Sequence, residues 1–154
     1  MQLSETEDMM ALFSSFDISA SGMTAQRLRS DIISQNLANV NTTRTSDGGP
    51  YVRKTVVFTE RQSTPFDQVL LTTSGRMGNG VKVTSVIEDN ETPMNMVYDP
   101  SHPDADENGY VTYPNVSTIT EMTNLIDASR AYEANVTAFD AAKTMALKGL
   151  EINK

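Results

Sequence analysis

The sequence predicts an α+β fold in which long N- and C-terminal helices pair as a coiled-coil-like layer, with a small central β-rich lobe between them. Residues 16–42 and 118–150 carry apolar residues at helical spacing. The residues between these stretches are rich in Gly, Pro, Asp and β-branched side chains. Both helical seams are long but only weakly apolar, so we expect neighbouring subunits to complete them. This pattern favours an assembly protein over an enzyme.

The N-terminal helix is expected over residues 13–42, after a flexible leader at 1–12. Ser14 and Ser15, with Asp17 close behind, suit a helix start. Apolar residues then recur every seven positions, which is a coiled-coil signal, but amides and hydroxyls interrupt them. These polar residues either face solvent or form a polar interface that weakens association while it fixes the register of the subunits. The residues expected at the subunit interface are Ile18, Ala25, Leu28, Ile32, Gln35, Asn36, Leu37, Asn39 and Asn41.

The central β-rich lobe is expected over residues 43–113. Residues 43–50, TRTSDGGP, break the helix with turn-forming residues. The segment near 60–80 is rich in Thr, Ser and Gly and is expected to be a mobile loop. Strands are expected at 51–58, at 81–89 with one buried face, in a short extended segment at 96–100, and at 110–116.

The C-terminal helix is expected within residues 114–154. Thr118 and Glu121 stand at the spacing of a capping box. Acidic residues lie early in the helix and lysines late, which complements the helix dipole. The residues expected at the subunit interface are Met122, Leu125, Ser129, Arg130, Tyr132, Asn135, Val136, Phe139 and Leu150.

Composition excludes several classes of partner and chemistry. The net charge of −8 argues against nucleic acid and anionic membranes, because both bind clustered Lys and Arg. The absence of Cys excludes disulfides, thiolate catalysis and Cys-ligated metals. No apolar stretch is long enough for direct membrane insertion, and the acidic start lacks the features of a secretory signal. We therefore expect a cytoplasmic chain, or one exported without a cleavable signal peptide.

One segment resembles the first half of a calcium loop. Asp104, Asp106, Asn108 and Gly109 follow the D-x-D-x-N-G pattern, and hard cations prefer such alternating oxygen ligands. The twelfth position, however, is Asn115 rather than a bidentate Glu. A turn with solvated acids is therefore the favoured interpretation, and a weak cation site is the alternative.

The single histidine, His102, is the other candidate for chemistry, because a His–Asp pair with Asp99 could act as acid and base. A general base needs a pocket that shifts its pKa, whereas a Pro-bounded acidic loop is usually hydrated. A structural role is therefore favoured. With no nucleophile and base at a catalytic spacing, we predict no enzyme activity, no cofactor and no metal.

Three segments resemble a known protein family. ISQNLANVNT (33–42) resembles the N-terminal signature of bacterial flagellar axial proteins, which comprise rod, hook and hook-associated proteins. SRAYEANV (129–136) resembles their C-terminal signature. VYDPSHPDADENGYVTYPNV (97–116) narrows the resemblance to the rod proteins of the flagellar basal body.

The resemblance implies a structural subunit of the proximal rod, which transmits motor torque as a tubular drive shaft and encloses the export channel. It also implies export through the flagellar type III apparatus and assembly in the periplasm. The implied partners are other copies, neighbouring rod proteins, the export-gate and MS-ring region at the rod base, and the export apparatus during secretion. Another rod protein of the same family is the nearest alternative, and a calcium-dependent binding module is a more distant one.

Overall fold

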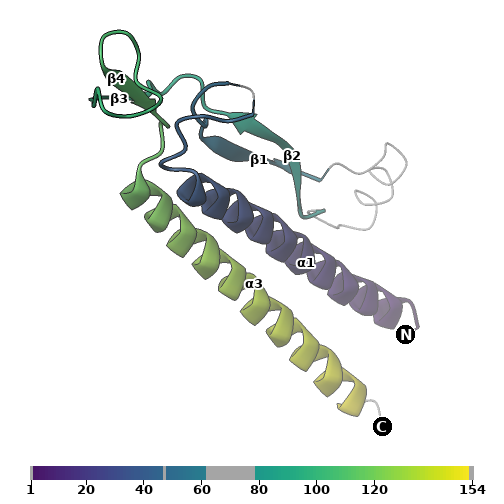
Figure 1. The fold of residues 1–154 in the computed structure, drawn as a ribbon. Coiled ribbons are helices and arrows are strands. Elements are labelled where there is room, and N and C mark those ends of the chain that lie inside the picture. Colours follow the sequence, from purple (N-terminus) through teal and green to yellow (C-terminus); the bar gives the residue numbers. More distant parts are fainter. Residues whose placement is uncertain (1, 47, 62–78, 153–154) are drawn as a thin grey trace. The chain divides into compact units, whose positions relative to one another are not determined.

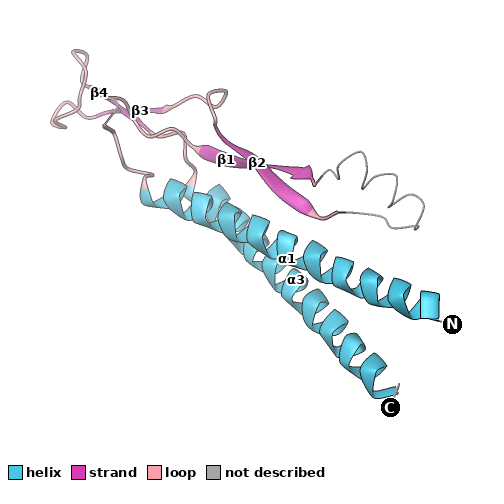
Figure 2. Cartoon of the chain, turned by 90° about the vertical axis from the view of Figure 1, so that its right-hand side faces the viewer, coloured by secondary structure: helices cyan, strands magenta, loops and turns pink. Residues whose placement is uncertain are grey.

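The computed structural model describes residues 2–46, 48–61 and 79–152, and it confirms the α+β class (Figure 1). Helix α1 spans Gln2–Ala38 and helix α3 spans Thr118–Ile152. Among the described residues between them in the sequence are four short strands (Figure 2). They are β1 (Lys54–Glu60), β2 (Val81–Glu88), β3 (Asn95–Tyr98) and β4 (Tyr110–Tyr113). The loop predicted near 60–80 falls mostly on residues 62–78, which lie outside the described residues.

Helix α1 begins and ends earlier than the sequence predicts. It starts at Gln2, so the start predicted at Ser14 is wrong. Residues 2–12 contain neither Gly nor Pro, which would disfavour a helix. Acidic residues near a helix N-terminus also stabilise the helix through its dipole. The helix ends at Ala38 and the chain then turns, with the Val40 amide bonded to the Leu37 carbonyl at 3.4 Å. This tightening of the last turn satisfies carbonyls that the helix leaves open.

Helix α3 begins where the sequence predicts, but its cap differs. The Glu121 amide donates to the Ser117 carbonyl at 2.9 Å, and the Ser117 hydroxyl accepts a bond from the Thr120 amide at 3.4 Å. Ser117 is therefore the N-cap residue, and the predicted Thr118–Glu121 capping box is wrong. The Glu121 side chain therefore does not cap the helix and is available for other contacts.

The strands form two separate two-stranded sheets. Strands β1 and β2 form one, and β3 pairs antiparallel with β4 with Val97 opposite Val111. The buried face predicted for the second strand is wrong, because Val86 and Ile87 of β2 are 42% and 49% exposed. Strand β4 stops at Tyr113 because Pro114 has no N–H to donate to a ladder.

The contacts divide the chain into two compact units, each with a segment of both helices. Unit 1 comprises Met1–Arg27, Phe58–Thr84 and Ser129–Lys154, and unit 2 comprises Leu28–Val57 and Ser85–Ala128. In unit 1 the rings of Phe16 and Phe139 lie 4.8 Å apart, and Gly22 lies against Asn135. Within that unit the two helix segments are therefore antiparallel.

Where the structure describes the side chains, few apolar residues are buried, and three of them are alanines. These buried residues are Ala25, Ile33, Tyr51, Val111, Val116, Ala128 and Ala142. Burial of a single methyl group removes little apolar surface from water, so alanines contribute little hydrophobic stabilisation each. Within the described residues, neither helix carries an apolar run that could cross a bilayer.

Candidate functional site

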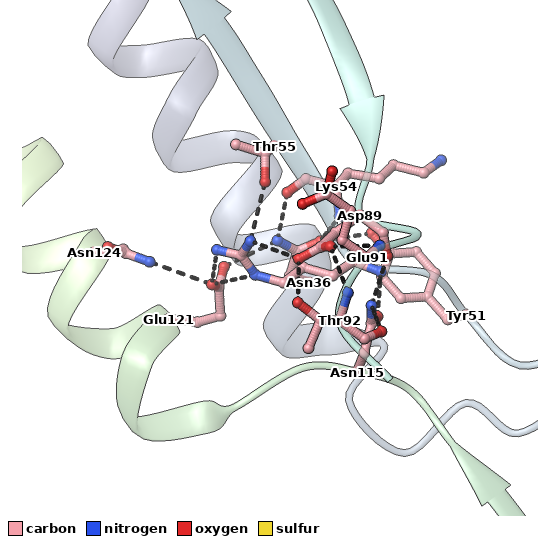
Figure 3. Close-up of polar contacts among 11 residues, drawn as sticks. Asn36, Tyr51, Lys54, Thr55, Asp89, Glu91, Thr92, Asn115, Glu121 and Asn124 are labelled. Carbon is pink, nitrogen blue, oxygen red and sulfur yellow. Dashed lines mark hydrogen bonds and ion pairs between the residues drawn. The ribbon is translucent and has the colours of Figure 1, made fainter. Parts of the chain in front are cut away.

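Asn36 of α1 is the centre of a buried polar cluster in unit 2 (Figure 3). Its Nδ2 donates to the Glu121 Oε2 and to the Lys54 carbonyl, both at 2.9 Å. Its Oδ1 accepts from the Lys54 amide and from the Tyr51 hydroxyl, again at 2.9 Å. All four hydrogen-bonding positions of the amide are thus used within the chain.

Glu121 is the buried acid of this cluster, with no exposed side-chain surface. Its Oε1 accepts from Arg53 through Nε at 2.9 Å and Nη2 at 2.7 Å. Asn124 adds a longer bond of 3.3 Å to the same oxygen (Figure 3). A buried carboxylate is tolerated when a cation and hydrogen bonds compensate it, and both are present here. We call Asn36, Tyr51, Arg53 and Glu121 the helix-end junction.

Asn115 extends the junction to the segment that follows β2. Its Oδ1 accepts from the Arg53 amide at 2.9 Å, and its Nδ2 donates to the carbonyls of Asp89 and Thr92 at 2.7 and 3.1 Å. Asp89 also lies 3.5 Å from the Arg53 guanidinium. The junction therefore ties α1, the start of β1, the turn after β2 and the start of α3 together within unit 2.

Two pKa shifts accompany this arrangement. Burial, followed by the nearby carboxylates of Glu88 and Glu121, raises the pKa of the Tyr51 phenol, which keeps it protonated as the donor to Asn36. Hydrogen bonds from the Thr92 amide and hydroxyl, with smaller effects from Glu91 and Arg53, lower the pKa of Asp89. Both shifts favour the protonation states that the hydrogen bonds require.

Besides the Phe16–Phe139 pair, several residues on the facing sides of α1 and α3 are polar or small. In unit 2 Asn36 meets Glu121, and seven residues along each helix stand Arg29 and Ala128, the latter fully buried. In unit 1 Gly22 lies so close to Asn135 that a Cβ there would approach the Asn135 Oδ1 to 2.5 Å. We call these residues the inner stripe: Gly22, Arg29, Asn36, Glu121, Ala128 and Asn135.

Several large apolar side chains of α3 are exposed. Ile119 is 80% exposed and Ile126 53% exposed, and Met122 and Leu147 are exposed as well. Among the heptad positions whose residues are exposed along α3, one carries three large apolar side chains, and we call it the outer stripe: Ile119, Ile126, Glu133, Asp140 and Leu147. Exposed apolar surface concentrated on one side of a helix marks a contact surface for a partner.

Comparison with known proteins identifies the family. A family model described as "Flagella basal body rod protein" matches residues 16–44, and one described as "Flagellar basal body rod FlgEFG protein C-terminal" matches residues 107–152. The chain is 46% identical over 152 residues to the flagellar basal-body rod protein FlgC of Bacillus subtilis, covering 94% of this chain and 100% of that protein. The FlgC proteins of Borreliella burgdorferi and Salmonella typhimurium are 45% and 41% identical, with coverage of 93% and 94% of this chain and 98% and 100% of theirs.

The chain belongs to the FlgC family of flagellar basal-body rod proteins. It is a structural subunit of the rod, as the sequence predicts. Membership in the FlgC family also implies assembly with other flagellar rod proteins in the basal body.

Asn36 belongs to the N-terminal signature at residues 33–42, and its side chain is buried within the chain rather than exposed at the surface. Asn36 has no exposed surface and no unused polar atom, which leaves it no group to offer a neighbouring subunit. Asn39 bonds locally, donating to the Gln35 carbonyl at 2.9 Å. Of the other N-terminal residues predicted at the subunit interface, Ala25 is buried, Leu28, Ile32 and Leu37 are half-buried, and Ile18, Gln35 and Asn41 are exposed.

The residues predicted at the interface on α3 divide into two groups. Leu125, Asn135, Val136 and Phe139 are half-buried, whereas Met122, Ser129, Arg130 and Tyr132 are exposed. The side chain of Leu150 lies outside the described residues. The first group includes residues that contact α1 within unit 1, namely Asn135 and Phe139. The second group is free to contact other molecules.

Two carboxylates of the acidic turn after β3 are used in contacts within the chain. The Asp106 Oδ1 accepts from the amides of Asn108 and Tyr110 at 2.9 and 2.8 Å. Asp104 accepts from the Thr43 hydroxyl at 2.8 Å and lies 3.6 Å from Arg44. Among the described residues, no group of three His, Asp or Glu side chains is arranged to hold a metal ion.

His102 belongs to the same turn. Its Nδ1 accepts a hydrogen bond from the Asp104 amide at 3.1 Å, which fixes the ring within the loop. The neighbouring Asp99 bonds instead to Ser101, and the hydroxyl and amide of Ser101 lower the pKa of Asp99. These contacts give the turn its shape.

Sequence reasoning did not identify Tyr51, Arg53 or Glu121 as members of one cluster. Tyr51 and Arg53 appear in the sequence only as part of an expected strand, and Glu121 only as a capping residue. The bond between Asn36 and Glu121 joins residues 85 positions apart, so no local pattern could reveal it.

Proposed function

We propose that this chain is a subunit of the proximal rod, where copies polymerise through their terminal helices into a tube that transmits motor torque and encloses the export channel. Its partners in this role are other copies, neighbouring rod proteins, and the export-gate and MS-ring region at the rod base. It reaches the periplasm through the flagellar type III export apparatus without a cleavable signal peptide. The relatives named as basal-body rod proteins support this proposal.

The outer stripe is the observation that carries the proposal. A helix of an independent protein would turn its large apolar side chains toward its own core. Here α3 turns Ala128 and Ala142 inward and leaves Ile119, Ile126 and Leu147 exposed. Such a distribution supports a subunit whose hydrophobic contacts are completed by neighbours.

We propose that different parts of the chain form different parts of the rod subunit. Residues 13–42 and 114–154 form the axial core domain, in which the helices pair as a coiled-coil-like layer. Residues 43–113 form a β-rich lobe on the outside of the tube. The inner stripe supports this division, because small and polar residues at heptad spacing allow close helix approach and a defined register.

The terminal helices are proposed to become fully ordered only on assembly. Apart from the Phe16–Phe139 pair, the α1–α3 contact consists mainly of small and polar residues, so it buries little apolar surface to offset the conformational entropy of two long helices. Hydrogen exchange of the dilute chain tests this, with exchange expected to be faster in both helices than in the strands and to slow when the chain assembles into rods. Slow exchange in both helices of the monomer would mean that the helices are stable without neighbours.

The rod role is tested by placing a charge on the outer stripe. Ile126→Asp should abolish rods and motility when it replaces the wild-type chain, because the carboxylate would be buried at the subunit contact. Ala138→Asp is the control, since Ala138 is exposed on the same helix but about 120° around the helix axis from Ile126. Rods are counted in isolated basal bodies by electron microscopy. Normal rods with Ile126→Asp would contradict the proposal.

A further inference from the structure

Arg29 is the one member of the inner stripe with a full charge and no partner. Its side chain is half-buried, yet within the described part of the chain it makes no hydrogen bond or ion pair. By contrast, Arg53 pairs with Glu121, and Lys54 lies 3.9 Å from Glu88. A partly desolvated guanidinium without an anion is unfavourable, and the position therefore favours binding of a carboxylate.

A cavity beside Arg29 provides room for such a group. It has a volume of about 140 Å³ and lies entirely within unit 2. Its walls are apolar at Ile32, Ile33 and Val56 and polar at Thr55 and Asn124. Arg53, Lys54 and Glu121 also line it, and the Glu121 carboxylate is already paired with Arg53. Since one water occupies roughly 30 Å³ in the liquid, the cavity can hold a carboxylate group. Its apolar walls strengthen an ion pair formed inside it.

The outer stripe supplies an anion of the required kind on a second copy. Glu133 and Asp140 stand one heptad apart on α3, between Ile126 and Leu147, and all four residues are exposed. Neither carboxylate has an ion-pair partner among the described residues. If the apolar members of the stripe pack against another subunit, these carboxylates are carried into the contact and need a cation there.

We propose that Arg29 of one copy binds the Glu133 carboxylate of a second copy in the rod. Glu133 lies at the middle of the outer stripe and has a longer side chain than Asp140, so it can reach into the cavity. A guanidinium can hold both oxygens of a carboxylate, which fixes orientation as well as affinity. The proposal rests on the proposed rod function, because it names one contact of that assembly.

Zero-length cross-linking tests the contact directly. Arg29→Lys keeps the charge and adds a reactive amine, which a carbodiimide joins to a carboxylate in ionic contact. Basal bodies with Arg29→Lys should yield a peptide pair linking position 29 to Glu133, whereas dilute monomer should not. Arg27→Lys is the matched control, because Arg27 is exposed on the same helix. A link from position 29 to a different rod protein, or no link, would overturn the proposal.

A charge exchange provides the second measurement. Arg29→Glu and Glu133→Arg should each reduce motility in soft agar at least tenfold, and the two together should restore at least half of it. Circular dichroism of the purified variants separates loss of contact from misfolding. A double variant no better than either single variant would overturn the pair. If Ile126→Asp abolishes rods while the link is absent, only this inference fails. Normal rods with Ile126→Asp would instead refute the proposed function.

Discussion

The two layers that join α1 to α3 rest on different physical principles. In unit 2 the Asn36–Glu121 layer is held by charge and by a complete set of hydrogen bonds. In unit 1 the Gly22–Asn135 layer is held by close approach, which the missing side chain of Gly22 permits. The hydrogen bonds of the first layer determine which side chains pair, whereas the small residue of the second layer determines how closely the two helices approach. A long and weakly apolar helix pair can therefore have a defined register without a large hydrophobic core.

The largest effect is expected at the charged layer. Glu121→Ala should lower the free energy of unfolding by about 3 kcal/mol, because it leaves Arg53 without its buried anion and Asn36 without one acceptor. Urea denaturation followed by circular dichroism measures the change. Glu107→Ala is the control, since Glu107 is exposed in a turn. Equal stability of the two variants would show that the junction contributes little.

The close-packed layer should respond to a single methyl group. Gly22→Ala should cost about 1–2 kcal/mol, because the new Cβ would lie 2.5 Å from the Asn135 Oδ1 and this clash outweighs the gain in helix propensity. Gly149→Ala is the matched control: it meets nothing within 4 Å and should stabilise by up to about 1 kcal/mol.

A double variant decides whether the contact itself is responsible. Adding Asn135→Ala to Gly22→Ala removes the clashing amide and should recover most of the lost stability. If the double variant instead loses as much free energy of unfolding as the two single variants together, the close approach of these two residues is not what limits substitution at Gly22.

A smaller change within the junction tests its hydrogen bonds without changing charge. Tyr51→Phe removes one of two donors to the Asn36 Oδ1 and should cost about 1 kcal/mol. Tyr98→Phe, at an exposed tyrosine, should be close to neutral. Thermal denaturation of both variants measures the difference. An equal loss of stability at both positions would mean that the effect does not come from the hydrogen bond to Asn36.

The smallest effect is expected from pH at the edge of the junction. The pKa of Asp89 is lowered from its ordinary value of 3.8, so its contribution to stability is present above that value and is lost as the pH falls through the lower folded-state pKa. Thr92→Val removes one of the stabilising hydrogen bonds and should raise the pKa of Asp89 toward 3.8. Carboxyl NMR titration measures the shift, and an unchanged pKa would contradict this assignment.

Much of the fold could be predicted because its signals are local. Helical spacing identifies α1 and α3, and β-branched residues with turn-forming neighbours identify the four strands. The element ends were less predictable. The N-cap of α3 is Ser117 rather than Thr118, because the choice between adjacent hydroxyls depends on the backbone entering the helix.

The candidate site, too, could be predicted from the sequence only in part. The heptad positions of the exposed residues on α3 can be read from the sequence, since a continuous helix fixes which residues share a face. The choice of which heptad faces inward could not be read, because both sides of α3 carry apolar residues. The structure buries Ala128 and Ala142 and leaves Ile119, Ile126 and Leu147 exposed, whereas Phe139 packs against Phe16.

The α+β class and the order of the elements follow from the sequence alone, and so does the flagellar rod family, through the two terminal signatures and the central segment. Periodicity, turn chemistry and contiguous motifs are properties of neighbouring residues, so they need no folded chain. The burial of Asn36 and the pairing of Glu121 with Arg53 become visible only in the folded chain. Their partners lie 15 to 85 positions away, and only folding brings such distant groups within hydrogen-bonding distance.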